Sequence, residues 1–505
     1  MECVTETDVL ISGAGAAGLT LAIELARRGV RFRLIDKLPT PFPGSRGKGI
    51  QPRSQEIFED LGILNRVVAA GGLYPPQREY HDDGSYEESL VVEDVAPSPA
   101  EPYHLALLVP QFLTERVMRE RLAELGHAPE FGVEMTGFEQ DEHGVVATLQ
   151  TAHGPERVRA RYLVGCDGGR SFVRSTLQLD FPGKTLGVRA VVADIVLHGL
   201  SRDAWHRFNE GDMDKQVSLC PLPGTPFFQL QAPIPLEGDI DLSAAGLQAF
   251  LDTRLAGNEL RVESVSWASA YHMNARLADR YRVGRIFLAG DAAHIHPPTG
   301  GQGLNTGVQD AYNLGWKLAA DLAGAPASML DSYEEERRPV AAAMLGLSTK
   351  LLDAAKQGEM RRGREVHQLD IGYPDSPLSF EMPARSGVLL AGDRAPDAPL
   401  AGAAGQDCRL FDLLKGPQWT LLGYEPGDAR FAARAGLHIH RIGTHEAIVD
   451  VERHFEHAYG LSKGDWVLVR PDGYVAAIVD AANLAALEGF LCSMGASARV
   501  QAPTE

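Results

Sequence analysis

The chain has 505 residues, of which 44% are hydrophobic and 23% charged, a balance that is typical of a globular protein with two or three domains and excludes large-scale disorder. The formal net charge of -19 argues against a nucleic-acid surface, because binding to phosphates needs clustered Lys and Arg. Five scattered cysteines without metal or redox-motif spacing, and no apolar run near the roughly 20 residues that span a bilayer, predict a cytoplasmic protein without a signal peptide or membrane anchor.

The first 36 residues predict a βαβ unit of the α/β class. A short apolar strand, Val9 to Ser12, is followed by a glycine turn, an alanine- and leucine-rich helix, and a second strand that ends at Asp36. The turn has G-x-G-x-x-G spacing and consists of Gly13, Gly15, Ala16, Ala17 and Gly18. Glycines here let backbone amides and a helix N-terminus approach a pyrophosphate, and Asp36, with Lys37 beside it, is placed to bind an adenosine ribose. The unit predicts a dinucleotide site without distinguishing FAD from a nicotinamide, and the alternative is a tight structural turn with a surface acid.

Further along the chain, the pattern predicts a second sheet and then a return to the first domain. Helical spacing predicts a helix at Gln111 to Leu125, and alternating segments such as Phe227 to Ala232 predict an antiparallel sheet. A strand at Arg285 to Ala289, the helix with Asp310 to Ala323 and a long helical region, Ala325 to Lys356, resume the α/β pattern. The predicted domains are 1–180 with an insert near 73–105, 181–275, 276–360, and, after a polar connection at 357–386, 387–505.

Two later segments resemble sequence motifs of flavoprotein aromatic hydroxylases. One is Val164-Gly165-Cys166-Asp167-Gly168-Gly169-Arg170-Ser171, and the other is Gly290-Asp291-Ala292-Ala293-His294 continuing as Pro297-Pro298-Thr299-Gly300-Gly301-Gln302-Gly303-Leu304-Asn305. With the glycine turn, they make residues 1 to about 351 similar to the para-hydroxybenzoate hydroxylase superfamily, especially its polyketide-tailoring and phenol-hydroxylase-like branch. The segments 392–400 and 467–475 resemble the thioredoxin-like C-terminal domain of the longer members. That domain has no C-x-x-C here, so we expect no thiol redox chemistry in it.

The resemblance implies a Rossmann-like FAD-binding domain, an antiparallel-sheet substrate domain and a monooxygenase reaction. NADPH or NADH would reduce FAD, dioxygen would form a flavin hydroperoxide, and an aromatic or polyketide-like small molecule would be hydroxylated. A carboxylate such as Asp291 suits a ribityl hydroxyl, and the helix N-terminus after Gly303 suits negative charge on the reduced ring. The implied cofactor contacts beyond the first unit are Arg46, Gly47, Gln111, Asp167, Gly290, Asp291, Pro298, Gly301, Gly303, Leu304 and Asn305. Asp167 is also compatible with a plain turn at a strand end.

Substrate contacts are expected from the second sheet and from the loop before Pro298. The predicted set is Phe228, Gln229, Gln231, Tyr271, His272 and Pro297. The predicted catalytic set is Arg46, His272, His296 and Pro298, in which either histidine could deprotonate a phenol unless no base is required. His294 and His296 lack the neighbours that would complete a metal site, so no metal is predicted.

The sequence is compatible with several alternative functions. Within flavin chemistry, Baeyer-Villiger oxidation and epoxidation are alternatives to hydroxylation, and a flavin-binding protein without oxygenase activity is an alternative of another class. A plain dehydrogenase is disfavoured by the Gly290-Asp291 segment. The expected partners are an aromatic substrate and dioxygen, without nucleic acid or membrane, in a monomer or homodimer.

Overall fold

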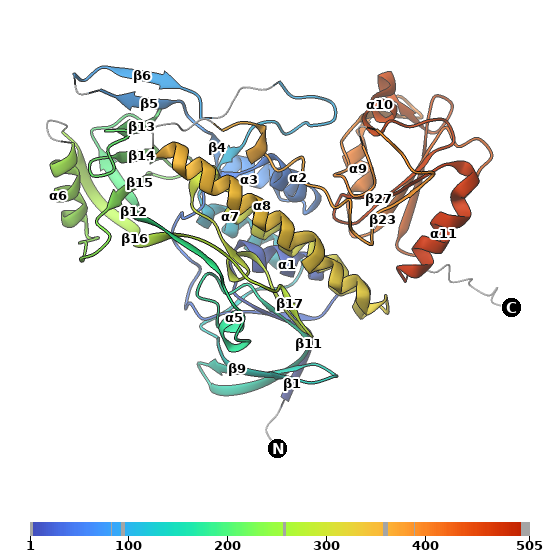
Figure 1. Cartoon of the computed structure of the whole chain (residues 1–505), viewed down its shortest axis with the longest axis horizontal. Coiled ribbons are helices and arrows are strands. Elements are labelled where there is room, and N and C mark those ends of the chain that lie inside the picture. The colour runs from blue at the N-terminus through green and yellow to red at the C-terminus, as the bar shows by residue number, and fades with distance from the viewer. Residues whose placement is uncertain are drawn as a thin grey trace.

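The computed structural model describes residues 4–81, 83–91, 96–255, 259–356, 362–387 and 389–495. Within these residues the chain forms three eight-stranded sheets and one of three short strands (Figure 1). The predicted α/β class is confirmed. Cys3 and the first residues of the predicted polar connection, 357–361, lie outside the described part. Among the described helices, none is both long and apolar enough to cross a bilayer.

The first sheet is built around the predicted βαβ unit. Strand β1 lies between β2 and β11 and runs parallel to both, and β18 joins β11 on its other side. Val9, Leu10 and Ile11 are fully buried, as expected for a parallel strand covered on both faces by helices. Its strands are β1 (Val4–Ser12), β2 (Phe32–Asp36), β8 (Glu130–Phe131), β9 (Glu134–Gln140), β10 (Val145–Thr151), β11 (Gly154–Gly165), β17 (Arg282–Val283) and β18 (Ile286–Leu288).

Helices and a small sheet surround the first sheet and position its ends. Helix α1 packs against both α4 and α7, which brings distant parts of the chain to the glycine turn. The helices are α1 (Ala16–Arg27), α2 (Pro52–Asp60), α3 (Leu64–Ala70), α4 (Gln111–Glu124), α5 (Phe172–Thr176), α7 (Gly303–Leu322) and α8 (Asp331–Ala355). The small sheet consists of β3 (Gly49–Ile50), β4 (Gly72–Leu73) and β7 (Leu107–Leu108).

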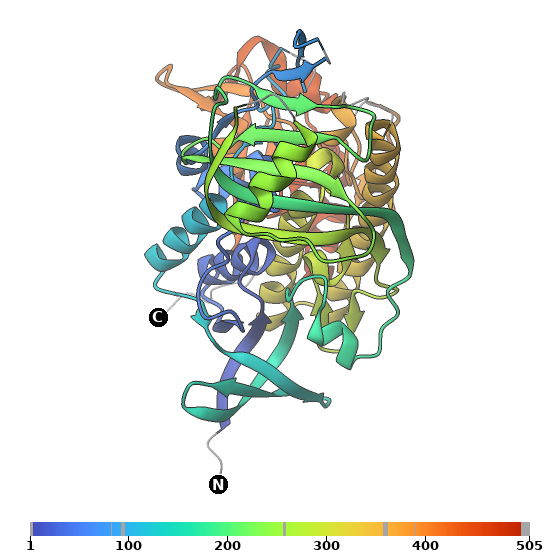
Figure 2. The same ribbon diagram turned by 90° about the vertical axis from the view of Figure 1, so that its left-hand side faces the viewer.

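The second sheet is mostly antiparallel and carries helix α6 (Ala244–Arg254) on one face, as Figure 2 shows. We call that face the outer face and the opposite one the inner face. Alternate residues along its strands belong to the outer face, which forms a core with α6, and the inner face turns toward the first sheet. The strands are β5 (Gln77–Tyr80), β6 (Tyr86–Ser89), β12 (Gly183–His198), β13 (Trp205–Phe208), β14 (Val217–Pro221), β15 (Phe227–Ile234), β16 (Arg261–Leu277) and β19 (His294–Ile295).

The C-terminal sheet combines a parallel strand pair with an antiparallel hairpin. Strand β23 runs parallel to β24 and antiparallel to β26, which pairs with β27. This arrangement agrees with the predicted thioredoxin-like domain. Its strands and helices are β20 (Phe380–Met382), β21 (Pro399–Gly402), β22 (Asp407–Arg409), α9 (Leu410–Leu414), β23 (Trp419–Tyr424), β24 (Leu437–Ile442), β25 (Ile448–Asp450), α10 (His454–Tyr459), β26 (Trp466–Val469), β27 (Val475–Val479) and α11 (Leu484–Ser493).

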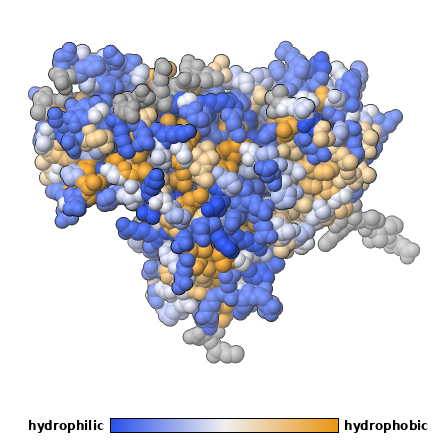
Figure 3. All heavy atoms as spheres, in the orientation of Figure 1, coloured by the Kyte–Doolittle hydropathy of each residue, from blue (hydrophilic) through white to orange (hydrophobic). Residues whose placement is uncertain are grey.

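Helix α8 joins the C-terminal sheet to the rest of the molecule through buried charges. In Figure 1 it crosses the molecule diagonally, and Figure 3 shows hydrophilic side chains spread over the same side of the surface, with apolar residues in separate patches. Glu336 of α8 is paired with Arg470 at 2.7 Å and with Lys317 at 2.6 Å, and all three side chains are at most 1% exposed. Burial by itself would raise the pKa of Glu336, but the two cations hold it far below the usual carboxyl range. The carboxylate is therefore ionised and fully paired.

Replacing Arg470 by Met should destabilise the fold, because Glu336 and Asp472 would lose a buried counter-charge. We expect a loss of about 3 kcal/mol in the free energy of unfolding, measured by urea denaturation. Arg441→Met is the matched control, since Arg441 pairs with Glu446 at 2.7 Å in the same sheet but is 25% exposed, and it should cost about 1 kcal/mol or less. Equal losses in the two variants would contradict the importance of the buried pair.

Candidate active site

The glycine turn between β1 and α1 forms a cradle that side chains would fill. Gly13 has a φ of +106°, and a Cβ there would lie 2.2 Å from the carbonyl oxygen of Cys166. A Cβ on Gly18 would lie 1.9 Å from the carbonyl oxygen of Gly13. Only glycine permits this close packing. Helix α1 begins directly after the turn, with Gly15 as its N-cap and Ala16 as its first residue. The turn therefore fits a pyrophosphate at a helix N-terminus.

Asp36 lies at the end of β2 and holds the turn in place. Its Oδ2 accepts a hydrogen bond from the Ala14 amide at 2.8 Å, and its Oδ1 accepts one from the Leu38 amide at 2.8 Å. A carboxylate has about four acceptor positions, so two remain for ribose hydroxyls. Asp167 follows β11 beside Gly13, and its Oδ2 accepts the Val173 amide at 3.0 Å at the start of α5.

Helix α4 brings a polar stripe to the same turn. Gln111, the predicted ribityl contact, accepts a hydrogen bond from the Gly47 amide at 3.0 Å and donates one to Glu115 Oε1 at 2.8 Å. Glu115 and Arg119 lie one and two turns further along, and the Nη1 atom of Arg119 is buried without a hydrogen-bond partner in the described residues. Sequence analysis missed both residues, although Glu115 and Arg119 follow Gln111 at successive intervals of four residues, which places all three on one helix face.

The Gly290-Asp291 segment lies next to the start of helix α1, where a Cβ on Gly290 would be 3.1 Å from the Cβ of Ala17. Gly290 has a φ of +62°, and its amide donates to Asp310 Oδ2 of α7 at 3.1 Å. Asp310 also pairs with His294 at 2.6 Å and with Arg337 at 2.8 Å. Burial would raise the pKa of Asp310, but the charges of His294 and Arg337 hold it at about 2. This buried anion fixes the segment and leaves Asp291 exposed beside it.

Two loops, residues 46–51 and 298–305, are tied together and are called here the paired loops. The Gln51 amide donates to Asn305 Oδ1 at 2.9 Å, Asn305 Nδ2 donates to the Gly49 carbonyl at 2.9 Å, and Gln51 Nε2 donates to the Gly300 carbonyl at 3.0 Å. A Cβ on Gly47 would lie 3.2 Å from Leu304. The structure thus brings the predicted contacts of both loops together. These contacts are Arg46, Gly47, Pro298, Gly301, Gly303, Leu304 and Asn305.

The inner face of the second sheet is turned toward the paired loops. Ser45 donates from its amide to Asp194 Oδ2 at 2.8 Å and from its hydroxyl to Oδ1, and Gln229 donates to Ser45. Arg46 lies 5.2 Å from the Phe42 ring centroid and 5.7 Å from that of Trp267. The fully buried Gln229 therefore supports the loop and is not open to a ligand.

Gln231 and Tyr271 are the half-buried predicted residues on this inner face. Val192 pairs with Gln231 on one side and with Ser269 on the other, so polar groups line neighbouring strands. Burial raises the pKa of Tyr271 to about 12 against the opposing charge of Arg46, so its hydroxyl stays neutral. A neutral phenol can both donate and accept a hydrogen bond.

The structure does not bring two of the predicted sheet residues, Phe228 and His272, to the inner face. Phe228 is 1% exposed and packs on the outer face with the α6 core, and His272 lies on the outer face with Nε2 3.2 Å from the Leu236 carbonyl. Adjacent strand residues point to opposite faces, which is the physical reason for this correction. His296 Nε2 lies 2.9 Å from His294 Nδ1, and Pro297 is buried. No group of three or more His, Cys, Asp or Glu in the described ranges is arranged to hold a metal.

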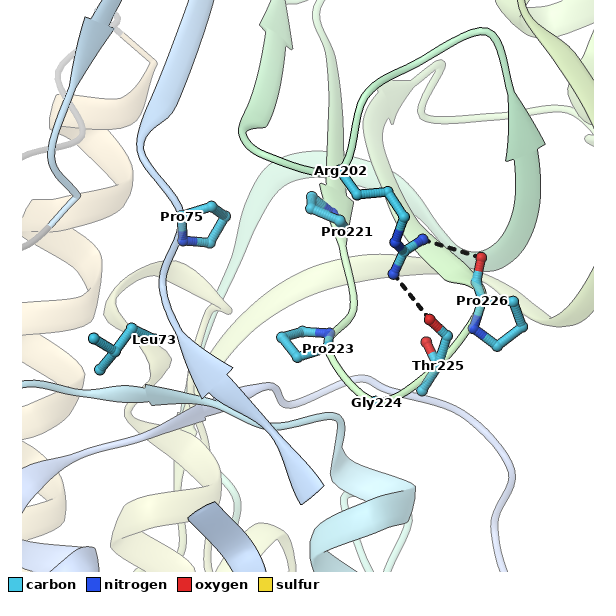
Figure 4. A pocket seen from close by; sticks show the side chains of 8 residues that line it. All are labelled: Leu73, Pro75, Arg202, Pro221, Pro223, Gly224, Thr225 and Pro226. Atoms are coloured by element: carbon cyan, nitrogen blue, oxygen red, sulfur yellow. Dashed lines mark hydrogen bonds between the residues drawn. The ribbon is translucent and has the colours of Figure 1, made fainter. Parts of the chain in front are cut away.

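A hollow of about 590 Å³ opens at the turn between β14 and β15 (Figure 4). The Arg202 guanidinium donates to the Leu222 and Thr225 carbonyls, both at 2.9 Å, and this fixes the turn. The volume is within the usual range of about 300–1,000 Å³ for ligand sites. Its lining residues are Leu73, Pro75, Arg202, Pro221, Pro223, Gly224, Thr225 and Pro226.

Comparison with known proteins identifies the family. Residues 6–348 match the family model described as an FAD binding domain, and residues 389–494 match the one described as aromatic-ring hydroxylase, C-terminal. The chain belongs to the FAD-dependent aromatic-ring hydroxylases. It is thus a flavin-dependent monooxygenase, as the sequence motifs predicted, and the glycine cradle and the paired loops fit its FAD cofactor.

Two relatives and one solved structure illustrate the likeness. A flavin-dependent monooxygenase of Mycobacteroides abscessus is 41% identical over 94% of this chain and 97% of its own. The 12-dehydrotetracycline 5-monooxygenase/anhydrotetracycline 6-monooxygenase of Streptomyces rimosus is 34% identical over 93% of this chain and 94% of its own. The structure of aklavinone-11 hydroxylase with FAD and aklavinone is 28% identical, with a TM-score of 0.80 over 97% of this chain and 99% of that one.

Replacing Asp310 by Asn should weaken FAD binding at least tenfold, because the Gly290 amide, His294 and Arg337 would lose their common anion. The dissociation constant is measured by titrating FAD into apoprotein and following flavin fluorescence. Asp321→Asn is the control: Asp321 lies on the same helix but accepts from the Tyr162 hydroxyl at 2.5 Å, and its replacement should leave FAD affinity unchanged. Unchanged affinity in the Asp310 variant would refute this assignment.

Proposed function

We propose that this monooxygenase hydroxylates a large, electron-rich aromatic compound of the polyketide type, with NADPH or NADH as reductant and dioxygen as co-substrate. The observation that carries the proposal is the inner face of the second sheet, where half-buried polar side chains and the Trp267 ring lie opposite the paired loops. Such a mixture of aromatic walls and a few placed polar groups suits a ring system with several oxygen substituents. The relatives named for tetracycline and aklavinone chemistry support the same substrate class.

Bound FAD would supply the redox chemistry, passing electrons from the reduced nicotinamide to dioxygen. The chain's own residues have three other tasks. The glycine turn and Asp36 would hold the nucleotide, Asp291 and Gln111 the ribityl chain, and the paired loops the flavin ring. Gln231 and Tyr271 would bind oxygen substituents of the substrate and so orient the carbon that reacts.

Arg46 and Pro298 are proposed to close the site around the reacting atoms. The guanidinium of Arg46 lies near the ring of Phe42 and near that of Trp267 on β16, and Pro298 is exposed on the other paired loop. A site closed in this way excludes water, which prevents loss of oxygen as peroxide. His296, turned onto His294, is proposed to support this loop instead of acting on the substrate directly.

The decisive experiment is a screen of polycyclic phenols, with anhydrotetracycline as the first probe, for stimulated NADPH oxidation under labelled dioxygen. We expect one labelled oxygen atom in a hydroxylated product. Insertion of the label next to a carbonyl carbon would indicate Baeyer-Villiger chemistry, and an epoxide would indicate alkene oxidation. NADPH oxidation without any labelled product from the panel would contradict the proposed substrate class.

Tyr271→Phe should raise the KM for the substrate severalfold and lower the ratio of product to NADPH consumed, because one donor is lost at the inner face. His272→Ala is the neighbouring control and should leave both quantities within about twofold, since this side chain is on the outer face. The measurement is steady-state oxidation of NADPH together with product quantification. A larger defect in the His272 variant than in the Tyr271 variant would mean that the substrate lies elsewhere.

A further inference from the structure

Glu115 lies beside the glycine turn, where the pyrophosphate is proposed to bind. Its side chain on α4 is 1% exposed, and its Oε1 lies 3.7 Å from the position that a Cβ on Gly15 would occupy. The Ala16 amide, in the first turn of α1, faces this carboxyl group. Gln111 Nε2 donates to Oε1 at 2.8 Å. The carboxyl group is thus a built part of the nucleotide site.

An ionised Glu115 would compete with the cofactor for the same positive end of helix α1. The FAD pyrophosphate is itself anionic and needs the amides of the glycine turn. Of the charged groups that face Glu115, Asp36 at the end of β2 adds negative charge and Arg119 on α4 adds positive charge, while Gln111 and the Ala16 amide are neutral donors. One guanidinium cannot neutralise a carboxylate and a pyrophosphate together.

Protonation of Glu115 removes this conflict without disturbing the neighbouring hydrogen bonds. Burial raises the pKa of Glu115 to about 7, because it outweighs the opposite effect of the hydrogen bonds from Gln111 and the Ala16 amide. The carboxylate can therefore take up a proton near neutral pH. Oε1 can still accept from Gln111, and the other oxygen gains an O–H group that can donate to an anion. In other enzymes, too, a buried carboxylic acid stays neutral at pH 7 and donates a hydrogen bond.

We propose that FAD binds with uptake of one proton from solvent by Glu115, whose neutral carboxylic acid then faces the pyrophosphate as a donor. The proton adds to a carboxylate oxygen, and no other bond forms or breaks. Gln111 transmits the effect, because its amide links Glu115 to the Gly47 amide of the paired loops. The proposal depends on FAD as the cofactor and is independent of the substrate.

The first test is the pH dependence of FAD affinity in apoprotein. For an acid that titrates near pH 7 when free and stays protonated when bound, the dissociation constant should be about tenfold higher at pH 8 than at pH 6. Glu115→Gln keeps the acceptor for Gln111 and cannot ionise, so its affinity should be the same at both pH values. Glu120→Gln is the matched control: Glu120 lies on the same helix, is 52% exposed beside Arg116, and its variant should retain the tenfold change.

A second test needs no variant. Calorimetric titration of wild-type apoprotein with FAD at pH 8, in two buffers with different ionisation enthalpies, should show uptake of close to one proton, and at pH 6 close to none. Equal FAD affinity at the two pH values, a pH dependence that persists in Glu115→Gln, or absence of proton uptake at pH 8 would each overturn the proposal. None of these results bears on whether labelled oxygen enters a product, so the proposed function is tested separately.

Discussion

The structure depends most on two buried ion pairs made by neighbouring residues of helix α8. Glu336 pairs with Arg470, which directly follows β26 in the C-terminal domain, and Arg337 pairs with Asp310, which holds the Gly290 segment. A buried charge without its partner is far more costly than a lost surface pair, so both contacts constrain the helix strictly. Through them the C-terminal domain and the floor of the FAD site share one rigid element.

Helix α2 is likewise held by buried polar contacts on two sides. Its first residues follow Gln51, which is bound to the loop at 300–305, while Arg53 donates to the Asp472 carbonyl at 2.7 Å and Glu56 accepts from Arg394 at 2.9 Å. Both partners belong to the C-terminal domain. That domain has no C-x-x-C motif, and its contacts include those with helix α2, which begins directly after Gln51 of the paired loops.

Local sequence patterns predicted the fold class and the three segments that lie together around the glycine turn, because glycine turns, strand ends and helix starts are defined by residues close in sequence. They could not decide which face of a strand a side chain takes. A shift of one residue exchanges the two faces, so Gln231 and Tyr271 lie on the inner face. Phe228, three residues before Gln231, and His272, next to Tyr271, lie on the outer face. Glu115 and Arg119 were missed because their significance comes from the packing of α4 on α1, which no local motif encodes.

Strands β12 and β16 form a long ladder within the second sheet. These strands have 16 and 17 residues and pair along most of their length, and β16 also pairs with β19 immediately before the loop that carries Pro298. The ladder is held by backbone hydrogen bonds, which do not depend on side-chain identity. Side chains on the inner face can therefore be replaced without loss of the backbone pairing that joins this sheet to the loop with Pro298.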